Sequence, residues 1–177
     1  MGRSYPGAQT VVGTREQAWH RGSPMTPGAC LEGAARLELQ ARDLYRTLAL
    51  RYFERPDLHD LFSRLAEEES LHAQRLVNLA GFPLRAGWDD TRQAHVAGQM
   101  AAMEAEAVAM VVRSSGRKPD HPHHILRWVV DFERRFSLVH AEELAPLFAP
   151  EARDLFLFLA TEDQRHRALL DDARRNS

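Results

Sequence analysis

Cysteine is almost absent from the chain, which has Cys30 alone among its 177 residues. A single cysteine cannot form an intramolecular disulfide, and this is the usual state of proteins in a reducing compartment. It also excludes the iron and zinc modules that are built on Cys-x-x-Cys pairs. Thiolate-based metal chemistry is therefore not expected.

Long apolar runs are lacking too. Residues 1–30 contain no continuous apolar core of the roughly 7–15 residues that a secretory signal needs. The most apolar long stretch, residues 97–112, includes Glu104 and Glu106 and is shorter than the ~20 residues of a membrane-spanning helix. We therefore expect a cytoplasmic protein without a membrane partner.

The chain also lacks an excess of charge of either sign. Its net charge of -2 gives no reason to expect a nucleic acid as partner. The length fits one domain, and 44% hydrophobic residues are enough for a sizeable core. Residues 1–29 hold five glycines and three prolines, so we expect them to form a flexible tail ahead of a domain at residues 30–177.

What the chain does have is helical periodicity. Apolar residues recur at steps of three and four in four long segments, and such spacing is typical of helices with one buried face. Pro56 and Pro150 separate neighbouring segments by short links, which favours two antiparallel hairpins. The predicted helices are residues 30–54, 58–80, 121–148 and 151–174, with an extra helix at about residues 91–112.

These elements predict an all-α, ferritin-like four-helix bundle. The connection at about residues 81–120 is long enough to cross the bundle, so the second and third of its helices should run parallel. The extra helix at residues 91–112 is amphipathic, rich in Ala and Met, and lies outside the four-helix set. Because it has apolar surface to cover, we expect a homodimer.

One motif occurs twice. Leu65-Ala-Glu-Glu-Glu69-Ser-Leu-His72 aligns position for position with Leu159-Ala-Thr-Glu-Asp163-Gln-Arg-His166. In each copy the acid and the histidine are three residues apart, so both side chains lie on the same face of the helix. That face is the apolar one, and ionisable pairs directed at a core need a partner such as a metal ion.

The surroundings of the motif are duplicated as well. Glu38 precedes Glu69 by 31 residues, and Glu133 precedes Asp163 by 30. A ring follows each of these upstream glutamates by seven residues, which is two helical turns: Tyr45 in the first half and His140 in the second. The chain is therefore interpreted as a duplicated helix hairpin with a carboxylate on one arm and acid-x-x-His on the other.

The pooled side chains fit a dimetal centre. One glutamate from each of two helices and an acid-x-x-His pair from each of the others form the ligand set of dimetal carboxylate bundles. Four carboxylates would balance two divalent cations, and oxygen with imidazole suits iron, manganese or zinc. The alternative is a metal-free bundle with ion pairs in its core. The candidate ligands are Glu38, Glu69, His72, Glu133, Asp163 and His166, with Glu162 as an alternative to Asp163.

Residues 30–175 resemble the rubrerythrin-like branch of the ferritin-like superfamily, through the motif Glu38-Leu-Gln-Ala-Arg-Asp-Leu-Tyr45 and the segment that ends at His72. The resemblance implies that the six candidates match ligand positions and that Tyr45 orients a ligand carboxylate. His140 stands in place of a second tyrosine and could be an extra ligand. Phe136 stands where rubrerythrins proper have a further glutamate.

The resemblance implies two iron ions and redox chemistry on hydrogen peroxide or dioxygen. No rubredoxin module is present in the sequence, so electrons would come from an external donor protein. Two alternatives remain open at this point. One is oxidation or handling of ferrous iron without substrate turnover, and the other is a partner-binding bundle with a relic metal site.

Overall fold

The computed structural model describes residues 26–80, 89–116 and 121–177, and every regular element within them is a helix. The elements are α1 (Pro27–Arg51), α2 (Pro56–Ala80), α3 (Asp90–Ser114), α4 (Pro122–Leu138), the π-helix η1 (Val139–Leu144), the 3-10 helix η2 (Ala145–Leu147) and α5 (Pro150–Arg175). None of these helices is both long and apolar enough to cross a lipid bilayer.

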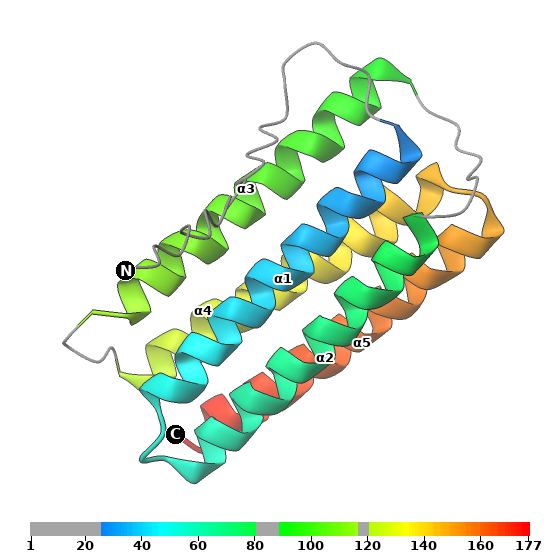
Figure 1. Cartoon of the computed structure of the whole chain (residues 1–177). Helices are drawn as coiled ribbons and strands as arrows, with labels where there is room; N and C mark the ends of the chain where they lie inside the picture. Colours follow the sequence, from blue (N-terminus) through cyan, green and yellow to red (C-terminus); the bar gives the residue numbers. More distant parts are fainter. Residues whose placement is uncertain (1–25, 81–88, 117–120) are drawn as a thin grey trace, which may run out of the picture.

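Helices α1, α2, α4 and α5 form the bundle (Figure 1). α1 packs on α2 as one antiparallel hairpin, α4 packs on α5 as the other, and α2 contacts α5. α3 lies along the outer side of α1 and returns the chain to the end of the bundle where α4 begins, so α2 and α4 run parallel (Figure 1). The predicted all-α, ferritin-like bundle is confirmed.

The first helix begins earlier than its apolar pattern suggested. The hydroxyl of Thr26 accepts a hydrogen bond from the amide of Ala29 at 3.1 Å, and Pro27 occupies the first turn, where its missing N–H costs nothing. Residues 27–29 of the predicted tail therefore belong to α1. The remainder of that tail, residues 1–25, lies outside the described residues.

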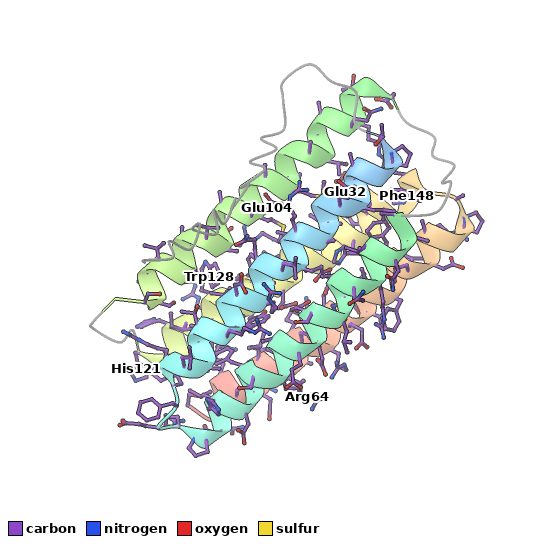
Figure 2. The ribbon with its side chains drawn as sticks, viewed as in Figure 1. Glu32, Arg64, Glu104, His121, Trp128 and Phe148 are labelled. Carbon is purple, nitrogen blue, oxygen red and sulfur yellow. The ribbon has the colours of Figure 1, made fainter. Side chains whose placement is uncertain are left out.

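The apolar face of α3 is covered within the chain. Met100, Met103 and Met110 are buried against the rest of the core, and α3 contacts both α1 and η1. Longer polar side chains tie α3 to α4: the indole of Trp128 donates to Glu106 at 3.0 Å (Figure 2). The apolar face of α3, from which the homodimer was predicted, is therefore already buried within the chain. The homodimer stays a prediction, but this face no longer supports it.

The helix predicted at residues 121–148 is not continuous. Its α-helical part ends at Leu138, and a π-helix and a 3-10 turn follow. Pro146 explains the change, because it has no N–H and its ring clashes with the carbonyl of Glu142 four residues earlier. Arg92 of α3 donates to that carbonyl instead, at 3.4 Å, while the amide of Ala145 donates five residues back, to His140.

Candidate metal centre

The structure brings all six candidate ligands to the middle of the bundle. Each of them is 0–1% exposed. Glu38 lies in α1, Glu69 and His72 in α2, Glu133 in α4, and Asp163 and His166 in α5. Their burial follows from the sequence, because each of them occupies a position in the apolar stripe of its helix.

Among the described residues, two groups of three have ligand atoms that lie within 4.8 Å of one another, and Glu69 belongs to both. We call them the His72 triad (Glu38, Glu69, His72) and the His166 triad (Glu69, Glu133, His166).

Glu69 directs one oxygen toward each imidazole. Its Oε2 atom lies 2.9 Å from His72 Nδ1, and its Oε1 atom lies 3.1 Å from His166 Nδ1. The two imidazole rings are nearly parallel, with centroids 5.6 Å apart. Glu69 could therefore offer one oxygen to each of two ions.

Asp163 belongs to neither triad. Its Oδ2 atom accepts a hydrogen bond from His140 Nδ1 at 2.8 Å, and His140 Nε2 lies 3.2 Å from Glu38 Oε1. The imidazole that stands in place of a tyrosine thus lies between one carboxylate of each hairpin. The alternative ligand Glu162 is directed to Arg165, at 3.0 Å, and the structure does not bring it into either triad.

The two rings predicted to lie beside the ligands reach across the bundle. The hydroxyl of Tyr45 donates to Glu133 Oε1, a carboxylate of the other hairpin, and His140 likewise approaches Glu38 of the first. Seven residues along a helix are about 10.5 Å, too far for a ring to contact the carboxylate of its own arm. In each half, the ring therefore contacts the upstream glutamate of the other half.

Tyr45→Phe should keep the ligand set and disturb only the direction of Glu133. We expect this variant to bind as many metal ions as the wild type, with a changed rate of oxidation after ferrous loading. Metal content and stopped-flow absorbance would measure the two quantities. Tyr52→Phe removes a hydroxyl just after the end of the same helix and is the matched control. A Tyr45→Phe protein that loses a metal ion would contradict the orienting role.

Glu68 is a contributor that the sequence interpretation missed. His166 Nε2 donates to Glu68 Oε2 at 2.8 Å, so this carboxylate holds the imidazole from the side away from the triad. Arg64 and Arg165 also donate to Glu68, at 3.1 and 2.7 Å, and Arg64 lies on the solvent side of α2 (Figure 2). The signal was present, since an acid precedes the inner carboxylate in both copies of the motif.

Protons take the place of cations in the metal-free centre. Burial alone would lower the pKa of each imidazole, but the surrounding carboxylates raise the pKa of His72 and of His140 to about 10 and that of His166 to about 12. Burial raises the pKa of Asp163 to about 7 and also raises that of Glu133. For Glu38, the nearby imidazoles of His140 and His72 outweigh burial and lower the pKa.

Even with these protons, the polar atoms of the centre do not all have hydrogen-bond partners. Within the described residues, seven of its buried polar atoms have no hydrogen-bond partner, which is costly in a protein interior. His166 Nδ1 and Glu69 Oε1 are both among them although they are only 3.1 Å apart. They converge without the alignment of a hydrogen bond, an arrangement suited to sharing a cation. The others are both Glu38 oxygens, Glu133 Oε2, Asp163 Oδ1 and His140 Nε2.

Comparison with known proteins gives one family. The Rubrerythrin family model matches residues 29–106, a range that contains Glu38, Tyr45, Glu69 and His72. Comparisons with curated proteins and with solved structures found no match. The rest of the centre lies beyond the matched range but repeats its motif and shares its site. Residues 29–106 are therefore similar to the Rubrerythrin family, and the all-helical bundle is consistent with a rubrerythrin-like, ferritin-like fold.

Proposed function

We propose that the protein is a di-iron carboxylate protein that carries out redox chemistry on hydrogen peroxide or dioxygen. The observation that carries the proposal is the pair of triads that share Glu69, surrounded by buried polar atoms without partners. One ion would take Glu38 and His72, and the other would take Glu133 and His166. Manganese and zinc suit the same donors, so iron is the choice that the resemblance favours.

The two iron ions would supply the two electrons that reduce a peroxide. The chain's own residues hold and shield them. Each ligand is at most 1% exposed, which keeps bulk water from the centre, and Tyr45 fixes the orientation of Glu133 by donating to it. Asp163 keeps one oxygen, Oδ1, without a partner, and this is the atom through which it would serve as a ligand. His140 holds the other oxygen of Asp163 and approaches Glu38.

The electrons would come from a separate donor protein. The described residues contain one cysteine, Cys30, which is buried, and burial raises the pKa of its thiol to about 12, so it is not suited to redox exchange. The same scarcity of cysteine is the support for a cytoplasmic location.

A second candidate is oxidation of ferrous iron without repeated turnover. Phe136 is the observation that favours it. This ring is 1% exposed and contacts the edge of His140, with centroids 5.1 Å apart, where rubrerythrins proper have a further glutamate. A metal ion that moved toward this position would meet no oxygen ligand.

Anaerobic reconstitution with ferrous iron tests the proposal. We expect two ions per chain, and we expect hydrogen peroxide to produce the near-ultraviolet absorption of an oxo-bridged diferric centre. Repeated peroxide consumption in the presence of a reductant supports the oxidoreductase, whereas a single stoichiometric oxidation supports the second candidate. Binding of fewer than two ions per chain overturns both.

A further inference from the structure

The duplication is broken at one pair of positions. Glu68 and Glu162 are aligned, and each lies four residues before the histidine of its own copy. Glu68 reaches across to the histidine of the other copy and accepts from His166 Nε2 at 2.8 Å. Symmetry would have Glu162 accept from His72 in the same way, and it does not.

Glu162 is directed to a different partner. Its Oε2 atom accepts from Arg165 at 3.0 Å, and the same guanidinium donates to Glu68 at 2.7 Å. His72 makes its polar contacts through Nδ1, to Glu69 and Glu38, and the described residues provide no acceptor for its Nε2. Its ring instead meets Phe158 edge-on, with centroids 6.5 Å apart. The two imidazoles therefore have different surroundings on the side away from the triads.

This difference affects how each histidine binds a metal ion. A carboxylate that accepts the outer N–H of an imidazole fixes the tautomer, so that the inner nitrogen presents its lone pair, and it also raises the basicity of that nitrogen. His166 has such a carboxylate and points Nδ1 into its triad, 3.1 Å from Glu69 Oε1. His72 lacks one.

The carboxylates of the two triads differ in the same direction. Glu133 in the His166 triad accepts from a neutral hydroxyl, that of Tyr45, and its Oε2 atom remains available. Glu38 in the His72 triad has no hydrogen-bond partner at either oxygen, but its Oε1 atom lies 3.2 Å from Nε2 of His140, an imidazole that would compete with a cation for that oxygen. Both contrasts favour the His166 triad.

We propose that the two metal positions are unequal: a divalent first-row cation fills the His166 triad first, and Glu68 is the positioning residue that makes this position the tighter one. The His72 triad fills second and exchanges its ion more readily. The inference rests on the proposed dimetal function, because it concerns how the two ions of that centre are divided between its triads.

Cobalt(II) titration tests the inference, with visible absorption reporting coordination and calorimetry reporting affinity. The wild type should bind in two distinguishable steps. His166→Ala should remove the tight step, and His72→Ala should remove the weak one. Glu68→Ala should weaken the tight step by ~10–100-fold, the range for residues that support a ligand, and leave the weak step unchanged.

Glu162→Ala is the matched control. It removes the same carboxylate from the aligned position and also takes one partner from Arg165, but it touches neither histidine. We expect both of its steps to match the wild type. Glu68→Gln, which keeps an acceptor without the charge, should give an intermediate loss and guards against misfolding of the alanine variant.

The outcomes separate the inference from the function on which it rests. Two cobalt ions bound with equal affinity, or equal losses in Glu68→Ala and Glu162→Ala, would overturn the inequality and leave the dimetal centre standing. Loss of the tight step in His72→Ala instead of His166→Ala would reverse the assignment and overturn it as well. A wild type that binds no cobalt would overturn the dimetal function together with the inference.

Discussion

Glu69→Ala should empty both metal positions. Glu69 is the residue common to the two triads, with one oxygen toward His72 and the other toward His166. Removing it leaves each position with one carboxylate and one imidazole from its triad. Since a residue that only supports a ligand already contributes ~10–100-fold in affinity, we expect a loss above ~100-fold at each position.

The measurement is the iron content of anaerobically reconstituted protein. For Glu69→Ala we expect fewer than about 0.1 iron ions per chain at micromolar iron. Glu67→Ala is the control and should retain two ions, because Glu67 lies two residues before Glu69 on the exposed side of α2. His166→Ala, which touches one triad, should retain one. If Glu69→Ala kept two ions, the ligands would lie elsewhere in the chain.

The sequence predicted the bundle and the composition of its centre because both depend on periodicity. The apolar stripe places Glu38 and Glu133 inside their helices, and the spacing of three in each acid-x-x-His pair gives the two side chains one direction. Duplication then supplies the second half. None of this requires knowledge of how the helices contact one another.

The features that the sequence did not predict depend on contacts between helices. The π-helix at residues 139–144 arises from Pro146 together with Arg92, a residue of the crossover helix α3 that donates to the carbonyl of Glu142. This segment holds His140 where it meets both Asp163 and Glu38. A pattern that treats residues 121–148 as one helix cannot show that the aspartate is bound by an imidazole.

The second feature that the sequence did not predict is that two aligned residues have different partners. Glu68 and Glu162 have the same sequence context, and only the packing of α2 against α5 decides that one of them reaches a histidine and the other an arginine. The reason given for a homodimer, uncovered apolar surface on α3, was wrong for a related cause, although the homodimer itself stays a prediction. Its methionines are apolar in any reading, but whether they face a second chain or α1 depends on where the crossover lies.

The stability of the metal-free protein should fall as pH rises from about 6 to about 9. Burial raises the pKa of Asp163 to about 7 from an unfolded value near ~3.8, so its contribution to the decline runs from ~3.8 to about 7 and ends early in this range. Burial by itself would lower the pKa of His72 and of His140. The nearby carboxylates outweigh it and raise the pKa of each to about 10. The stability from these imidazolium groups is complete below ~6.5 and declines as pH approaches 10.

Metal binding should reverse this trend, because an imidazole must lose its proton before it can bind a cation. For each proton released, metal affinity should rise tenfold per pH unit, about 1.4 kcal/mol, which corresponds to ~3–6 °C in Tm for a domain of this size. We therefore expect the Tm difference between zinc-loaded and metal-free protein to widen steadily from pH 6 to pH 9. Differential scanning calorimetry measures it directly. His72→Ala should reduce the slope, whereas His124→Ala, at an exposed histidine near the start of α4, should leave it unchanged. A Tm difference that stayed constant or narrowed over this range would mean that protons and metal ions do not compete for the same buried side chains.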